Sequence, residues 1–174
     1  MRAAISVLNL LLVAASARAT EPQVRYYVGE AKRSSDDGKS LGSEVFLAKR
    51  TVDRDQSTIT EQPIIVDENG KVTEWTIRFT VKEDGTFTIE DDTKRMKGTG
   101  KLFGPAWKWT YFKATYKVGD EVEIQDENFL SDESCGSARQ RFTWKGKGTS
   151  YRDLTLKEIT PKTYEILRAG LMKK

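Results

Sequence analysis

The chain has 174 residues, of which 29 are Lys or Arg and 26 are Asp or Glu, with one Cys and no His. A protein without histidine cannot use a Ser-His-Asp or Cys-His catalytic site, a haem held by imidazole, or an HExxH zinc site. The sequence therefore predicts no metal and no cofactor. No motif in it names a reaction or a ligand, so an enzyme is the less favoured class of function.

Residues 1–19 have the features of an export signal in the usual order. Arg2 supplies a basic start, and residues 3–15 form an apolar stretch that is too short to span a bilayer. Ala17 and Ala19 supply the small residues that a signal peptidase needs before its cut. We predict cleavage after Ala19, which leaves one domain of residues 20–174 in the periplasm or outside the cell. No later segment is apolar enough to predict stable membrane insertion.

The balance of charges bears on the partners of the protein. Removal of Arg2 and Arg18 leaves 27 basic residues against 26 acidic ones, and the two kinds are interspersed along the sequence. A nucleic-acid-binding surface needs a continuous positive stripe, so we expect no nucleic-acid partner. Cys135 is the single cysteine and has no intrachain partner. It is either a loop thiol without a role or the site of an intermolecular disulfide in a homodimer.

Alternation of apolar and polar residues dominates the chain from Tyr26 onward. In residues 75–82 every odd position is apolar and every even position is polar, which is typical of a strand with one buried face. Asn69-Gly70, Asp84-Gly85 and Gly119-Asp120 are turn sequences. The predicted strands cover residues 24–32, 43–53, 57–66, 71–82, 85–91, 94–103, 107–118, 121–130, 138–145, 150–159 and 163–172.

Roughly ten strands joined by short turns predict an all-β fold, a single antiparallel up-and-down meander. A flat sheet of that size would leave long unpaired edges, so we expect closure into a β-barrel of roughly 8 to 10 strands. Gly98 and Gly100 alternate on one face of a strand, where the absence of side chains either allows sharp curvature or leaves room inside the barrel.

Two segments depart from simple alternation. Near Tyr111 and Phe112 the apolar phase changes, which indicates either a β-bulge or a strand covered on both faces by another element or a second subunit. In residues 121–130, Asp126 and Asn128 share a face with Val122 and Ile124. An inward carboxylate needs a partner, for which Arg139 and Arg141 are candidates. The alternative is a solvated strand end whose charges face water.

Aromatic residues are spread over most of the predicted strands. Such side chains make good walls for an apolar or planar ligand, and they equally make a good packed barrel core. The chain resembles the lipocalin-like, or calycin, barrels of exported proteins. The residues that carry this likeness are Gly98-Thr99-Gly100, Asp126-Glu127-Asn128-Phe129 and Arg139-Gln140-Arg141-Phe142-Thr143-Trp144. The resemblance implies a barrel whose open end admits a small hydrophobic molecule.

Three functions are consistent with these patterns. The first is non-enzymatic binding of a small hydrophobic or aromatic ligand inside the barrel. The second is a structural or interaction module of the cell envelope with a packed core, and the third is a barrel isomerase or hydrolase that uses Asp126 with Arg139 or Arg141. For the first, we expect an aromatic cavity wall and polar groups that orient the ligand. The expected ligand-binding residues are Trp75, Trp107, Trp109, Asp126, Asn128, Arg141, Phe142 and Trp144.

Overall fold

The structure is a computed structural model that describes residues 21–103, 111–130 and 135–172, with the backbone alone for residues 111, 128–130 and 135. It contains eleven strands and one helix in the described residues. The elements are β1 (Gln23–Ser35), β2 (Ser40–Asp53), β3 (Thr58–Asp67), β4 (Val72–Glu74), β5 (Ile77–Val81), β6 (Thr86–Asp91), β7 (Met96–Phe103), β8 (Tyr111–Val118), β9 (Val122–Leu130), β10 (Cys135–Trp144), β11 (Gly148–Ile159) and α1 (Pro161–Leu171).

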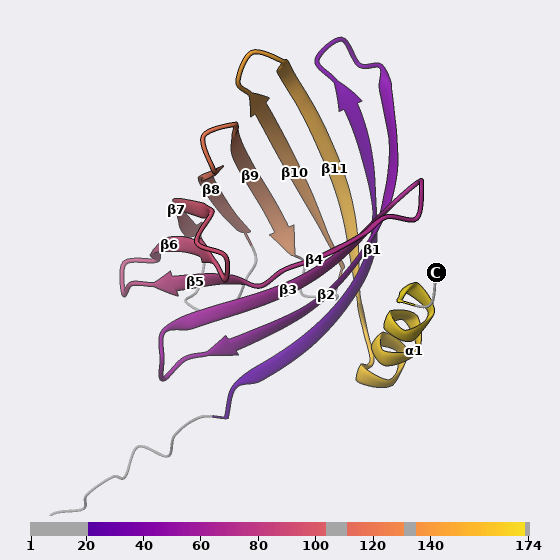
Figure 1. Cartoon of the computed structure of the whole chain (residues 1–174). Coiled ribbons are helices and arrows are strands. Elements are labelled where there is room, and N and C mark those ends of the chain that lie inside the picture. The colour runs from indigo at the N-terminus through magenta and orange to yellow at the C-terminus, as the bar shows by residue number, and fades with distance from the viewer. Residues whose placement is uncertain (1–20, 104–110, 131–134, 173–174) are drawn as a thin grey trace, which may run out of the picture.

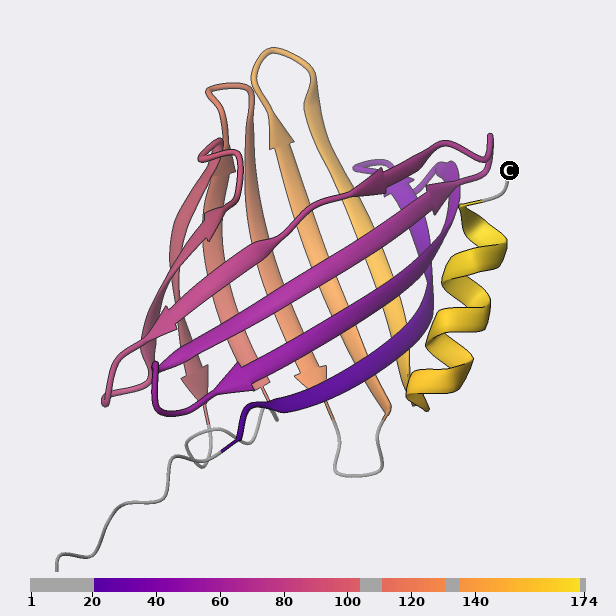
Figure 2. The same cartoon turned by 60° about the horizontal axis from the view of Figure 1, so that its bottom comes forward.

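Ten of the strands form a closed antiparallel barrel, which confirms the predicted fold class (Figures 1 and 2). Consecutive strands pair from β5 to β11, and β11 pairs with β1. The pairings of β1 with β2, β2 with β3 and β3 with β5 complete the circuit. The remaining strand, β4, pairs with β3 at residues 64–66, beyond the region where β5 pairs with β3. The single strand predicted over residues 71–82 is therefore two strands, interrupted at Trp75 and Thr76.

The interior follows from the alternation of side chains along each strand. One end of the barrel, which we call the turn end, carries the turns at residues 92–95, 119–121 and 145–147 (Figure 2, top). Towards the opposite end, Phe79, Phe87 and Phe112 meet edge to face, with ring centroids 5.6 to 6.3 Å apart. These three rings fill that part of the barrel, so the packed core predicted as an alternative occupies part of the interior.

The last element is a helix, and the strand predicted over residues 163–172 is wrong. Thr160 is the N-cap, and its hydroxyl accepts a hydrogen bond of 3.2 Å from the backbone N–H of Thr163. Pro161 takes the first helical position, where its missing N–H costs no hydrogen bond. The helix begins here because the Thr160 cap supplies a hydrogen-bond acceptor to its first turn and Pro161 has no N–H that would need one.

Helix α1 packs on the outside of the barrel beside β1 (Figure 1). Tyr164 is 4% exposed and forms a cluster with Leu47 of β2 and Ile64 of β3, both fully buried. Its ring lies 4.8 Å from that of Tyr26 on β1. Strands β2 and β3 are thus buried on both faces, with the interior on one side and the helix on the other.

The two glycines of β7 do not leave free space inside the barrel, because side chains of neighbouring strands occupy the space beside them. A Cβ at Gly98 would lie 2.2 Å from the Cβ of Tyr116, and one at Gly100 would lie 2.3 Å from the ring of Phe87. The aromatic side chains of neighbouring strands therefore pack directly on the backbone of β7. Strand β8 pairs regularly from Tyr111 to Val118, and the segment before it, residues 104–110, lies outside the described residues.

Candidate functional site

A cavity of about 360 Å³ lies inside the barrel, between the three packed phenylalanines and the turn end. Val118 and Val122 flank the turn between β8 and β9, and Trp144 ends β10 at the next turn, so the cavity extends towards this end. The wall is mainly apolar. Its lining residues are Phe46, Arg50, Glu61, Pro63, Ile65, Thr73, Trp75, Ile77, Phe79, Ile89, Asp91, Met96, Phe112, Tyr116, Val118, Val122, Ile124, Asp126, Gln140, Phe142, Trp144, Arg152, Leu154 and Leu156.

Aromatic rings form one part of the wall. Phe142 and Trp144 point inward from alternate positions of β10 and are stacked, with ring centroids 6.3 Å apart and planes 15° apart. The indole N–H of Trp144 donates a hydrogen bond of 3.2 Å to the hydroxyl of Ser150. Trp75 contributes a ring from the break between β4 and β5, and its indole nitrogen is buried without a hydrogen-bond acceptor in the structure. Flat rings held in this way suit a planar ligand.

Polar side chains cross the cavity wall as a ladder over three neighbouring strands. Asp126 of β9, Gln140 of β10 and Arg152 of β11 lie directly opposite one another in the register. The Gln140 amide donates a hydrogen bond of 2.9 Å to the Asp126 carboxylate, and its carbonyl accepts one of 3.0 Å from the Arg152 guanidinium. Arg152 is also 2.8 Å from the carboxylate of Glu44 on β2, which is 7% exposed. We call Glu44, Asp126, Gln140 and Arg152 the polar belt.

Tyr116 joins the belt from β8. Its hydroxyl lies 3.4 Å from the Asp126 carboxylate and accepts a hydrogen bond of 3.3 Å from the Gln140 amide. Burial and the negative charge of Asp126 both raise the pKa of the Tyr116 phenol well above its usual value. The phenol is therefore protonated at neutral pH and can donate a hydrogen bond to an acceptor.

A second buried ion pair lies on the wall opposite the ladder. Arg50 of β2 and Glu61 of β3 are direct neighbours in the register, and Glu61 accepts hydrogen bonds of 2.9 and 3.2 Å from Arg50. The guanidinium also lies 5.1 Å from the ring centroid of Tyr27. Burial lowers the pKa of Arg50, but the charge and hydrogen bonds of Glu61, together with Tyr27 and the charge of Asp126, outweigh it, and the pKa is raised. In the described part of the barrel, Arg50 and Arg152 thus lie near the carboxylates of Glu44, Glu61 and Asp126.

The expected ligand-binding residues divide into four groups in the structure, of which Arg141 alone forms the last. Trp75, Asp126, Phe142 and Trp144 line the cavity. Asn128 occupies a position of β9 opposite Phe112 and Ala138, and nothing of its side chain is described. Trp107 and Trp109 lie outside the described residues.

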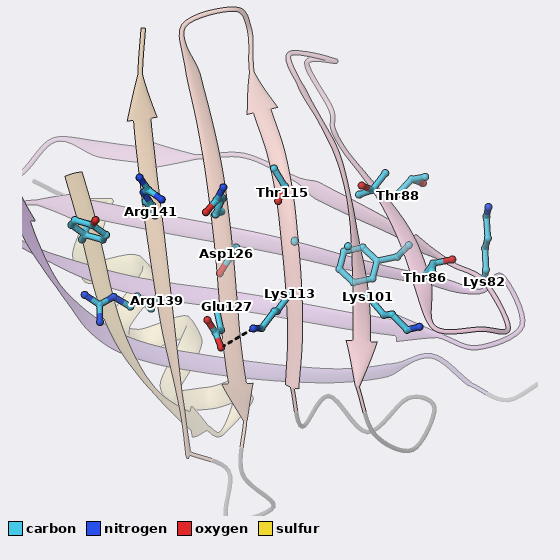
Figure 3. A pocket seen from close by; sticks show the side chains of 16 residues that line it. Lys82, Thr86, Thr88, Lys101, Lys113, Thr115, Asp126, Glu127, Arg139 and Arg141 are labelled. Atoms are coloured by element: carbon cyan, nitrogen blue, oxygen red, sulfur yellow. Dashed lines mark ion pairs between the residues drawn. The ribbon is translucent and has the colours of Figure 1, made fainter. Parts of the chain in front are cut away.

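The interior position expected for Arg141 is wrong. Arg139 and Arg141 are exposed on the outer face of β10 (Figure 3). Arg139 lies 3.5 Å from Asp153 of β11. The reason is the strand period of two, because Phe142 and Gln140 take the inward positions between them. The isomerase or hydrolase arrangement that paired Asp126 with these arginines is therefore absent from the described residues, and Gln140 and Tyr116 are the neighbours of Asp126 instead.

Among the polar residues of the barrel interior, sequence reasoning missed Arg50, Glu61, Gln140 and Arg152 of the cavity wall, and Glu44 beside them. Each occupies an inward position of its strand, in phase with apolar residues such as Phe46 and Leu154. A charged residue in phase with a buried face was a usable signal, and it was read only at Asp126. Within the described residues, no three His, Cys, Asp or Glu side chains gather to hold a metal ion.

Comparison with known proteins gives a likeness of fold. No protein-family model matches the chain, and no curated protein sequence matches it. Among solved structures, the S-type phycobiliprotein lyase CPES from Guillardia theta is similar, with a TM-score of 0.53 and 6% sequence identity over 77% of this chain and 85% of that one. The likeness supports a lipocalin-like barrel fold for this chain. The helix in the described part of the chain lacks the length and apolar character needed to cross a membrane.

Proposed function

We propose that the barrel binds a small, largely apolar or aromatic molecule in its interior cavity and does so without catalysing a reaction. The observation that carries this proposal is a cavity of about 360 Å³ in which a wall of aromatic rings meets a buried polar belt. Ligand sites in proteins have volumes of about 300 to 1,000 Å³, with mostly apolar walls and a few polar groups that set orientation. The cavity meets each of these conditions.

The polar belt supports binding better than it supports a purely structural role. Burying charged groups costs free energy, and well-packed apolar residues of similar volume are often as stabilising as a buried ion pair. A barrel interior that needed only stability would therefore gain little from Asp126, Gln140 and Arg152. We infer that the belt orients a polar group at one end of the ligand, while Phe142 and Trp144 contact its flat apolar body.

We also propose that the protein acts after export, as a lipocalin-like carrier in the periplasm or outside the cell. The support for this is the sequence of residues 1–19, with its basic start, apolar core and Ala17-Arg18-Ala19 ending. Amino-terminal sequencing of the protein purified from its own source tests it directly. A mature chain that begins at Thr20 is expected, and a chain that retains residues 1–19 would contradict export by this signal.

Native mass spectrometry of protein from its own source tests ligand binding. We expect an added mass that disappears after denaturation and extraction with organic solvent. The matched variants are Val118→Trp, which places a large ring in the cavity wall, and Lys117→Trp, which places the same ring on the exposed outer face of the same strand. The added mass should be lost in the first variant and kept in the second. A bare mass for the native protein, or retention of the ligand by Val118→Trp, would refute the proposal.

A further inference from the structure

A second hollow, of about 780 Å³, lies on the outer face of strands β6 to β10 (Figure 3). Its floor is a row of uncharged polar side chains that lie directly opposite one another on neighbouring strands. The floor residues are Thr88, Thr99, Thr115 and Gln125. The hollow forms because the three short threonines lie beside longer side chains, and we call it the threonine groove.

Lysines border the threonine groove on both sides. On β7 and β8, Lys101 lies opposite Lys113 on one side of the floor, and Lys97 lies opposite Lys117 on the other. Like charges directly opposite each other destabilise a sheet. Acids of the next strands lie opposite these lysines in part, with Glu90 opposite Lys97 and Glu123 opposite Lys117, so their repulsion is partly offset. The residues that line the hollow itself have an excess of positive charge, which indicates a surface adapted to an anion. Its outward charged residues are Lys82, Lys101, Lys113, Arg139 and Arg141 against Glu127.

The positive charge of the protein is concentrated on this face. The outward positions of strands β5 to β10 carry seven basic residues against three acidic ones, which leaves 22 basic residues against 23 acidic in the rest of the chain. The sequence conceals this distribution because acids and bases alternate along it, and the strand register brings the bases together. The basic residues are Arg78, Lys97, Lys101, Lys113, Lys117, Arg139 and Arg141, and the acidic residues are Glu90, Glu123 and Glu127.

We propose that the threonine groove binds a linear anionic polysaccharide. Lysines four residues apart on a strand are about 13 Å apart along it, which leaves space for one extended chain between the two rows. The floor spans four strands, about 14 Å at the usual strand spacing, and offers hydroxyl and amide groups that can hydrogen-bond to sugar hydroxyls. Carboxylate or sulfate groups on the glycan would lie between the paired lysines.

The chemistry of the groove favours a glycan over other polyanions. Single-stranded nucleic acids are held by aromatic side chains on which bases stack. Among the described residues that line the groove, Tyr151 is the outward aromatic residue. The Arg139 guanidinium already covers its ring, 5.3 Å from the ring centroid. A membrane surface would need outward apolar side chains to insert, and the floor consists of threonines and a glutamine. This binding is independent of the interior cavity.

The test uses heparin oligosaccharide as a probe, in isothermal titration of the mature protein at low salt. We expect binding that weakens as salt increases, because exposed charges are screened. Lys101→Gln with Lys117→Gln removes one charge from each pair and should lower the affinity roughly tenfold. The melting temperature should change little, because both lysines are exposed. The matched control is Lys145→Gln with Lys157→Gln, which removes two exposed lysines elsewhere and should keep the native affinity.

A second variant separates recognition in the groove from diffuse attraction to positive charge. Thr99→Val with Thr115→Val removes two floor hydroxyls at constant charge, and we expect its affinity to fall several-fold. No binding of heparin by the native protein, or unchanged affinity in either the lysine or the threonine variant, would overturn the proposal. Tighter binding of a deoxythymidine oligonucleotide, polyglutamate or phosphatidylglycerol vesicles than of heparin would overturn the assignment to a glycan.

Discussion

The substitution Gln140→Met tests whether the polar belt is a connected network. Methionine has a similar length and volume but cannot form the hydrogen bonds of 2.9, 3.0 and 3.3 Å that join Gln140 to Asp126, Arg152 and Tyr116. A buried polar group that loses its partner costs about 1 to 3 kcal/mol, and Arg152 retains its contact with Glu44. We therefore expect a loss of about 2 to 4 kcal/mol in the free energy of unfolding, or about 5 to 15 °C in melting temperature.

Urea unfolding followed by tryptophan fluorescence measures this loss. The control is Arg141→Met, on the same strand but exposed, which should change the free energy of unfolding by no more than about 0.5 kcal/mol. Because Gln140 and Arg152 share a hydrogen bond, the double variant with Arg152→Met should be less destabilised than the sum of the single variants. If Gln140→Met were as stable as Arg141→Met, or if the two belt substitutions were additive, the network would be refuted.

Three further predictions concern other parts of the barrel. Gly98→Ala should destabilise the protein by about 3 kcal/mol in thermal unfolding, since its new Cβ would overlap backbone and side-chain atoms of β8. The control is Gly170→Ala in α1, whose new Cβ meets no atom within 4 Å and which should be neutral or stabilising. Tyr164→Ala should cost about 3 kcal/mol and reduce the helical circular dichroism signal, because this ring attaches α1 to the barrel; an unchanged signal would contradict that attachment. Because the pKa of the Tyr116 phenol is raised in the folded protein, it gives stability that is present below the unfolded pKa of about 10 and is lost as the pH rises beyond it. In unfolding titrations between pH 9 and about 12, the free energy of unfolding of Tyr116→Phe should therefore fall less steeply with pH than that of the native protein.

The buried charges and the lysine pairs have a common feature. Both reduce stability relative to simpler alternatives, since the interior encloses Arg50 and the partly buried Arg152, and the groove places lysines directly opposite each other. These two features are the places where we propose that the protein binds other molecules.

Sequence alone determined most of the strands, the closure of the sheet and part of the cavity wall. Strand period is a local property, so the alternation in residues 75–82 and 138–144 identified Trp75, Phe142 and Trp144 as inward. The phase of Asp126 with Ile124 allowed an inward carboxylate but left a solvated strand end as the alternative. The same period places Arg141 outside, because it alternates with Gln140 and Phe142.

Tertiary structure alone decided which residues meet. The contacts of Asp126 with Gln140, and of Gln140 with Arg152, depend on the register between strands, which the pattern within one strand does not encode. The same holds for the lysine pairs of β7 and β8, whose members are 12 to 20 residues apart in the sequence. The cap and the proline of helix α1 are local signals in the sequence. The surface that the helix covers is not, because Leu47 of β2 and Ile64 of β3 come together only when the two strands pair in the barrel. The physical reason is that local sequence sets the direction of each side chain, whereas pairing across strands sets its neighbours.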